Sequence, residues 1–297
     1  MDQLQMKRNS PVREGPDFIG VGPEKTGTTW IDRKLRSHPS VDLCSVKELR
    51  YFWECEFFPG ENFFQRLKTD ASWHRKQYVD YLRGRFRAFI RHPRSVLMDR
   101  DDLVWDLRYL FKAHDDDWYR ANFTDASAPS AGEVSPQYFF LPEHRIHHVQ
   151  QVAPNARIIV SLRRPADWIW SFVKMIRKSG HLEKRFGTME RFIETRHETY
   201  NFSQALANWI KVFGHDQVLV LIYDELLENP ERYFTRICEH LGIDLELANR
   251  DALATRVNVG ESEQMPKDLE KTIQAMWQDD MRHLSDIVPG IPVTWIG

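Results

Sequence analysis

Residues 17–30 read DFIGVGPEKTGTTW, and the fold of the whole chain can be predicted outward from them. They are typical of a short apolar strand, a tight glycine-rich turn and the first turn of a helix. Such a turn leaves backbone N–H groups unpaired at a helix N-terminus, where they bind anions. Lys25 adds a mobile positive charge, and hydroxyl donors come from Thr26, Thr28 and Thr29. A phosphate-like group is therefore the expected ligand.

The order of residues in this loop separates two classes of phosphate site. A Walker A loop reads G-x-x-x-x-G-K-[ST], with its lysine after the glycine, whereas here Lys25 precedes Gly27. The loop resembles instead the 5′-phosphosulfate loop of sulfotransferases that use PAPS (3′-phosphoadenosine 5′-phosphosulfate). That loop reads K-[ST]-G-T-T and is often followed by tryptophan, which is Trp30 here. The alternative is a strand–turn–helix with an incidental lysine.

Composition limits the classes of function that the chain can have. Its 297 residues are 42% apolar, which is enough for one large core. The net charge of −2 carries no nucleic-acid signature, so no nucleic-acid partner is expected and any anion site must be a local patch. Three scattered cysteines predict no disulfide framework and favour a reducing compartment. The oligomeric state cannot be predicted from these features.

The N-terminus and the apolar runs address the compartment. Residues 1–15 are polar and lack the apolar stretch of a secretory signal, so residues 1–16 are expected to form a flexible tail. No apolar run approaches the length of a membrane span. We therefore expect a cytoplasmic enzyme. Because animal Golgi sulfotransferases carry a membrane anchor, the loss of such an anchor is the alternative.

The segment Lys47-Glu48-Leu49-Arg50-Tyr51-Phe52 follows a short strand expected at residues 41–44. It resembles the K-E-x-x-[FY]-F segment of heparan-sulfate-type sulfotransferases, in which the glutamate is the general base. The resemblance implies that role for Glu48. A charged loop with an aromatic anchor is the alternative.

Residues 131–139 read AGEVSPQYF and resemble the E-K-S-x-x-Y-[FL] segment of the same family. Glu133 and Ser135 match, whereas Val134 replaces the lysine. The resemblance implies that Glu133 lies beside the acceptor, as a second candidate for the base. Developing charge on the sulfate would then be neutralised by Lys25, alone or with an arginine such as Arg50.

A continuous apolar run at residues 157–162 predicts a buried parallel strand, and Arg163 and Ser171 follow it. An arginine at a strand end and a serine on the next helix can converge on one phosphate. The spacing resembles the family segment that binds the 3′-phosphate of PAPS. An arginine at a strand end and a buried serine, without a ligand, are the alternative.

Two more nucleotide contacts follow from the resemblance. Tyr223, after a buried strand expected at residues 217–223, would lie near the adenine, although core packing would also explain it. Asn258, with Arg256, belongs to a loop that covers the nucleotide in related enzymes.

Residues 53–130 match the family least and are expected to form a helical insertion on the acceptor side. Arginines, acids and aromatics alternate there, as on solvated helix faces. The alternative is an insertion whose arginines hold an anionic or sugar acceptor.

Patterning of the remaining chain predicts several further helices. They are expected at residues 143–153, 188–213, 230–241 and 266–284, with a closing apolar segment at 291–296. The twelve histidines contain no spacing suited to a metal, so no metal site is expected.

Together these observations predict one α/β domain over residues 17–297, a P-loop-like three-layer sandwich with a mainly parallel sheet flanked by helices. The resemblance implies transfer of a sulfuryl group from PAPS, leaving PAP (adenosine 3′,5′-bisphosphate), to an acceptor hydroxyl or amine, with a glycan favoured. Glu48 would take the proton in an in-line transfer. A small natural product or lipid is the alternative acceptor. A nucleotide kinase and a non-catalytic nucleotide-binding module are the alternative functions.

Overall fold

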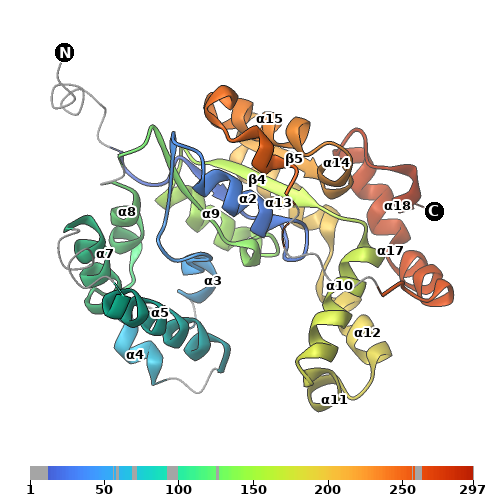
Figure 1. Ribbon diagram of the computed structural model, residues 1–297. Helices are drawn as coiled ribbons and strands as arrows, with labels where there is room; N and C mark the ends of the chain where they lie inside the picture. Colours follow the sequence, from blue (N-terminus) through green and yellow to red (C-terminus); the bar gives the residue numbers. More distant parts are fainter. Residues whose placement is uncertain are drawn as a thin grey trace.

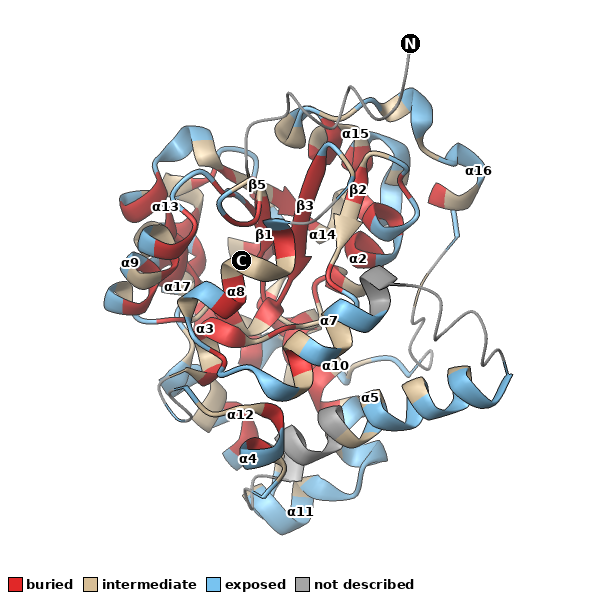
Figure 2. Cartoon of the chain, turned by 90° about the vertical axis from the view of Figure 1, so that its left-hand side faces the viewer, coloured by how far each residue is buried: buried red, intermediate tan, exposed pale blue. Residues whose placement is uncertain are grey.

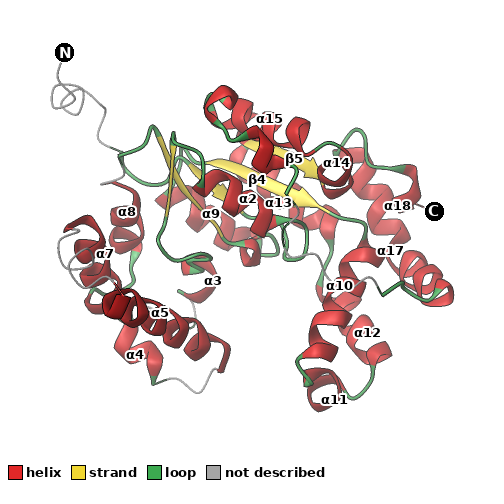
Figure 3. Ribbon diagram, viewed as in Figure 1, coloured by secondary structure: helices red, strands yellow, loops and turns green. Residues whose placement is uncertain are grey.

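The computed structural model describes residues 13–55, 57, 60–68, 72–91, 100–124, 127–255, 257 and 263–296. Within them, five strands form one sheet in the order β2-β3-β1-β4-β5, and every neighbouring pair is parallel. The strands are β1 (Phe18–Gly20), β2 (Val41–Leu43), β3 (Ser130–Val134), β4 (Arg157–Leu162) and β5 (Val218–Ile222). The expected α/β class with a parallel sheet is confirmed, and Figure 3 shows the strands in yellow among the helices in red. In the strand order, β1 is the middle strand. All five strands therefore end at the same edge.

Helices cover both faces of the sheet, because successive strand residues point to opposite sides. Ile19 and Val160 belong to one buried cluster, which includes α9 (Glu143–Val152) and α13 (Phe202–Phe213). Phe18 belongs to a second cluster, which includes α2 (Thr28–Arg36) and α15 (Pro230–Leu241). Figure 2 shows these helix pairs on opposite sides of the strands. The three layers predicted from the sequence are present.

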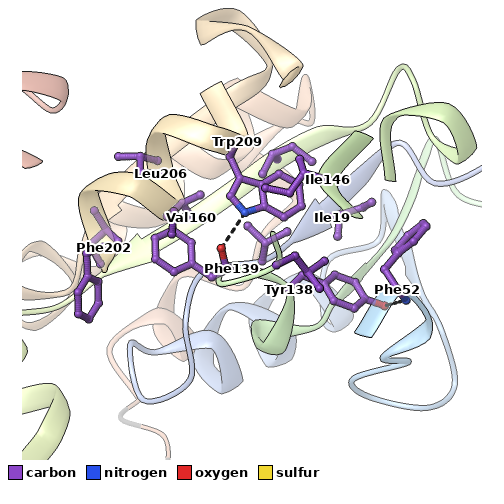
Figure 4. Close-up of a cluster of buried hydrophobic side chains, with 14 of the residues drawn as sticks. Ile19, Phe52, Tyr138, Phe139, Ile146, Val160, Phe202, Leu206 and Trp209 are labelled. Atoms are coloured by element: carbon purple, nitrogen blue, oxygen red, sulfur yellow. Dashed lines mark hydrogen bonds between the residues drawn. The ribbon is translucent and has the colours of Figure 1, made fainter. Parts of the chain in front are cut away.

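The larger cluster is anchored by polar atoms as well as by apolar contact. The indole Nε1 of Trp209 donates to the carbonyl of Phe139 at 3.0 Å, and the backbone N–H of Phe52 donates to the hydroxyl of Tyr138 at 3.4 Å (Figure 4). The first bond joins α13, and the second bond joins the segment after β2, to residues 138 and 139, which follow β3. The core thus fixes the residues that follow β3.

Two groups of helices extend from the sheet on either side of the edge where the strands end (Figure 1). The first contains α3 (Tyr51–Glu54), α4 (Phe63–Leu67), α5 (Ser72–Arg91), α7 (Arg100–Phe111) and α8 (Asp116–Thr124). The second contains α10 (Pro165–Lys178), α11 (His181–Phe186) and α12 (Met189–Thr199). The first group occupies the described part of the segment in which a helical insertion was expected, residues 53–130.

The remaining elements are short connections and the C-terminal helices. They are η1 (Pro136–Tyr138), η2 (His215–Gln217), α14 (Tyr223–Glu228), η3 (Leu245–Leu247), α16 (Arg250–Leu253), α17 (Lys267–Ile287) and α18 (Val293–Ile296). In the part of the chain that is described, no helix combines the length and apolar character needed to cross a bilayer.

The single helix expected over residues 188–213 is wrong, because the structure has α12 and α13 with a break between them. The Asn201 side chain accepts a hydrogen bond from the backbone N–H of Gln204 at 2.7 Å and so caps α13. Asp280 on α17 accepts from the N–H of Phe202 at 2.7 Å and of Ser203 at 2.9 Å. A cap and a distant carboxylate together end one helix and start the next.

The tail expected at residues 1–16 lies outside the described residues as far as residue 12. Arg13 pairs with Asp17 at 2.8 Å and donates to the carbonyls of Ala128 at 2.9 Å and Pro129 at 3.0 Å. Gly15 and Pro16 are buried. The chain is therefore already joined to the core at Arg13.

Candidate active site

The turn between β1 and α2 is held from several directions. Within it, the Thr26 hydroxyl donates to the carbonyl of Pro23 at 2.6 Å. From β4, the hydroxyl of Ser161 donates to the carbonyl of Thr26 at 2.5 Å, and from α10 the indole of Trp168 donates to the carbonyl of Glu24 at 2.8 Å. These bonds fix the loop before any ligand arrives.

Gly27 allows the chain to enter α2 close to the side chains of Leu226 and Tyr223. Its φ of 90° lies in the left-handed region that favours glycine. A Cβ on this residue would lie 2.9 Å from Leu226 Cδ2 and 3.1 Å from the ring of Tyr223. No side chain caps the start of α2 among the described residues. This helix end therefore presents backbone N–H groups and a positive dipole to a ligand.

A cavity of about 560 Å³ opens beside this turn and brings together residues from four separate segments. Its lining includes six of the residues predicted to bind the donor: Lys25, Gly27, Trp30, Arg163, Ser171 and Tyr223. The volume suits a ligand of nucleotide size. Lys25 and Arg163 supply positive charge from the ends of neighbouring strands.

Arg163 is positioned by the same loop that it faces. Its guanidinium donates to the carbonyl of Lys25 at 3.1 Å and lies 4.5 Å from the ring centre of Tyr223. Arginine stacks on aromatic faces while keeping its other donors directed elsewhere. The contact holds the arginine at the mouth of the β1 loop.

Lys25 carries its charge in a partly desolvated position. Burial lowers the pKa of its ammonium group, and the neighbouring Arg163 lowers it further. Glu24 and Glu48 oppose the shift. A desolvated lysine interacts more strongly with an anion than a lysine in bulk water does. Its backbone φ of 69° lies in the left-handed region.

Glu48 is held by three partners at the end of β2. Its carboxylate accepts from Arg50 at 2.6 Å, Lys47 at 3.2 Å and Gln137 at 2.9 Å. Burial would raise its pKa, but the charges of Arg50 and Lys47 and the hydrogen bonds outweigh burial and lower it. Glu48 is therefore ionised at neutral pH. It lies outside the lining of the cavity, within electrostatic reach of Lys25.

Glu133 is enclosed beneath that segment. Its side chain accepts hydrogen bonds from Tyr119 at 2.7 Å, Tyr138 at 3.1 Å and Ser135 at 2.5 Å, and the residue is 2% exposed. Burial raises its pKa, and the three hydroxyl donors oppose the rise. The Ser135 hydroxyl accepts in turn from the backbone N–H of Arg50 at 3.3 Å. Glu133 thus supports the Glu48 segment from inside the core.

The other residues predicted to contact the donor are buried, bonded to protein groups or outside the described residues. Thr26 is fully buried with its hydroxyl bonded inside the turn, and Thr28 is buried at the first position of α2. Thr29 accepts from the ammonium group of Lys47 at 2.9 Å. Trp30 packs edge-on against Tyr233 at 5.8 Å, so it is a wall of the cavity and part of the core. Asn258 and Arg256 lie outside the described residues.

Two lysines in the cavity were not predicted. Lys174 and Lys178 line the same wall of α10 as Ser171. They follow Ser171 by three and seven residues, the spacing of one helix face. That period was the signal by which they could have been found. Gln137, which also donates to Glu24 at 3.1 Å, could not have been found because it meets both glutamates only in the folded chain.

Two further features bear on the chemistry. Among the described residues, no group of three or more His, Cys, Asp or Glu side chains could hold a metal ion. The three cysteines are unpaired, with Cys44 and Cys238 buried and Cys55 partly buried.

Comparison with protein families gives one match that covers most of the chain. The model described as "Sulfotransferase family" matches residues 16–246. These residues include β1 to β5 and every predicted site residue within the described part of the chain.

Curated proteins match more distantly. Human carbohydrate sulfotransferase 15 is 21% identical over 91% of this chain and 51% of its own length. Human bifunctional heparan sulfate N-deacetylase/N-sulfotransferase 2 is 25% identical over 77% of this chain and 22% of its own length. The chain thus spans about half, or less, of the curated relatives that it matches.

Solved structures share the fold. A sulfotransferase from Alicyclobacillus acidocaldarius superposes with a TM-score of 0.63 and 20% identity, covering 94% of this chain and 98% of that one. The sulfotransferase domain of the Synechococcus PCC 7002 olefin synthase gives 0.57 and 17%, covering 95% and 98%.

Proposed function

This chain belongs to the sulfotransferase family, and from that premise we propose that it transfers a sulfuryl group from PAPS to an acceptor hydroxyl or amine. The observation that carries the proposal is the shared cavity of Lys25 and Arg163. Lys25 follows β1 and Arg163 follows β4, and these two strands are neighbours in the sheet. A donor with phosphate groups at both ends can be held by both at once.

The transfer resembles phosphoryl transfer, in which a loose anionic transition state is stabilised by position and charge. We assign Lys25 and the N-terminus of α2 to the 5′-phosphosulfate, where they would stabilise charge on the bridging and equatorial oxygens. Arg163 and Ser171 would hold the 3′-phosphate and so distinguish PAPS from ATP. Tyr223 would lie beside the adenine.

We assign Glu48 as the general base that takes the acceptor proton. Its support is that the carboxylate is ionised at neutral pH, as accepting a proton requires, and that it lies within electrostatic reach of Lys25. For Glu133 we propose a positioning role, because its oxygens are occupied by three hydroxyl donors within the core.

A carbohydrate is the acceptor that we favour. The support is that the proteins similar to this chain include a carbohydrate sulfotransferase and a heparan sulfate N-deacetylase/N-sulfotransferase. A small natural product or a lipid is the second candidate. We also propose a reducing compartment such as the cytoplasm, which the three unpaired cysteines favour.

The test is sulfate transfer from ³⁵S-labelled PAPS to a panel of glycans, lipids and phenols. The wild-type chain is expected to label one class. Glu48→Gln should lower that rate about 10²- to 10⁴-fold, the usual contribution of a general base, while retaining affinity for PAP. Normal transfer by Glu48→Gln would overturn the base assignment. Transfer of the γ-phosphate of ATP in place of sulfate would overturn the proposed reaction.

A further inference from the structure

Exposed apolar side chains gather on the helical group between β2 and β3. Of the fourteen large apolar side chains exposed among the described residues, ten lie between Phe57 and Phe111. They are Phe57, Phe64, Leu82, Phe86, Phe89, Ile90, Leu103, Val104, Leu107 and Phe111. A concentration of this kind on one part of a molecule marks an interaction surface.

Helix α5 carries the most regular part of this surface. Leu82, Phe86, Phe89 and Ile90 are 37%, 64%, 43% and 63% exposed. Their spacing of four, three and one residues places them in one stripe about 100° wide along the helix. The stripe is therefore a continuous apolar face that the described chain leaves open to solvent.

A row of arginines runs directly beside this stripe. Arg83, Arg87 and Arg91 are exposed and follow one another at intervals of four residues. Arg83 has a distant, exposed partner in Asp80 at 3.8 Å. Residues 72–91 contain six Lys or Arg and one Asp, although the whole chain has a net charge of −2. The positive charge is thus local to α5.

The third face of α5 is the one that fixes the helix. Tyr81 and Arg85 both bond to Asp106 on α7, and the Tyr81 ring lies 5.8 Å from that of Trp105. The apolar and basic rows therefore point away from α7. Figure 2 shows α5 extending from the body of the molecule, and most residues from 79 to 91 are exposed.

We propose that α5 docks on an anionic lipid surface. A helix with adjacent apolar and basic rows lies in the membrane interface, with its apolar side chains among the acyl chains and its basic groups at the phosphates. Arginine can bury its stem while its guanidinium reaches the headgroups. A second copy of the chain fits less well, because two strongly basic helices repel one another. This docking is independent of the proposed donor chemistry.

The test is sedimentation of the full chain with phosphatidylcholine vesicles that contain or lack phosphatidylserine. We expect binding to the anionic vesicles alone, weakened by added salt. Phe86→Ser with Ile90→Ser should abolish it. Arg83→Gln with Arg87→Gln and Arg91→Gln should weaken it about tenfold or more, because each basic residue near an anionic surface contributes to binding. Leu247→Ser is the matched control, since Leu247 is 51% exposed on a different part of the chain.

Each variant is first checked for a wild-type melting temperature, so that a binding defect is not a folding defect. The proposal is overturned if the wild-type chain ignores anionic vesicles, or if the α5 variants bind them as well as Leu247→Ser does. Self-association that Phe86→Ser with Ile90→Ser abolishes, without vesicle binding, would assign the face to a second copy instead.

Discussion

Lys25, Glu48 and Arg50 are the residues other than glycine that hold a positive φ in the described chain, with values of 69°, 58° and 59°. A side chain in this region costs of order 1–2 kcal/mol relative to a right-handed conformation. Lys25 lies between β1 and α2, and Glu48 and Arg50 lie between β2 and α3. Local strain of this kind persists where surrounding contacts enforce it, and it often marks a functional site.

At the residue scale, the lowered pKa of Lys25 predicts the alkaline side of the pH–rate profile. Burial and Arg163 lower that pKa below its ordinary value of 10.5, so the charge on Lys25 is lost earlier as pH rises. We therefore expect the wild-type rate to fall on the alkaline side at a pH below 10.5. Lys25→Arg keeps its charge because arginine is not deprotonated in proteins, so it should shift the fall upward. Lys25→Met should lower kcat about 10²- to 10³-fold at every pH.

The measurement is kcat against pH for the three forms. An alkaline limb that stays in place in Lys25→Arg would show that another group titrates there.

Glu48 sets the opposite limb. Burial raises its pKa, but Arg50 and Lys47 outweigh burial and bring the pKa below the ordinary value of 4.5. The base therefore stays ionised as pH falls through 4.5, and activity should persist there. Arg50→Gln removes the closest charge and should move the acidic limb of kcat/KM upward. Arg282→Gln breaks only the exposed pair with Asp279 and is the control. An unmoved limb in Arg50→Gln would contradict the assignment.

At the element scale, Glu133 joins β3, α8 and η1 beneath the Glu48 segment. Glu133→Ala would leave the hydroxyls of Tyr119, Tyr138 and Ser135 without their shared acceptor. Since buried unpaired polar groups are costly, we expect about 1–3 kcal/mol less free energy of unfolding. Urea denaturation measures it. Glu263→Ala, which loses an exposed pair with Arg177, should change stability by about 0–1 kcal/mol. Equal losses in the two variants would refute a supporting role.

The same substitution, glycine to alanine, is expected to have opposite effects at Gly27, directly before α2, and at Gly84, inside α5. Gly27→Ala places a methyl 2.9 Å from Leu226 in a backbone with φ of 90°, so it should lower both stability and affinity for PAP. Gly84→Ala meets nothing within 4 Å inside a helix and should stabilise the chain by about 0.5–1 kcal/mol. Thermal melts with and without PAP compare them. Tolerance of Gly27→Ala would mean that the turn can move.

Elements were predictable where their pattern is local. The strand at Arg157–Leu162 and the helix at Pro230–Leu241 have the bounds expected from the sequence. The break between α12 and α13 was missed, because half of its cause is Asp280 on another helix. The contact of Thr26 with the ligand stays a prediction; the hydrogen bond from its hydroxyl to the carbonyl of Pro23 could be found only in the folded turn.

At the scale of the whole molecule, the sequence predicted a mainly parallel sheet flanked by helices, but not the order of its strands. β3 lies between β1 and β2 although the insertion separates it from both along the chain. This order depends on pairing between strands far apart along the chain, which no local pattern records. Lys25 and Arg163 were predicted as contacts to opposite ends of the donor, and only the folded chain shows that both line one cavity.

The account rests on one cavity that holds both phosphate-bearing ends of a single nucleotide donor. Isothermal titration of the chain with PAP and with ADP tests this directly, because only PAP carries the 3′-phosphate. We predict that PAP binds about 10- to 100-fold more tightly, the contribution of charged hydrogen bonds to one phosphate. Arg163→Ala should remove that preference while Arg282→Gln keeps it. Equal affinity for the two nucleotides in the wild-type chain would contradict the account.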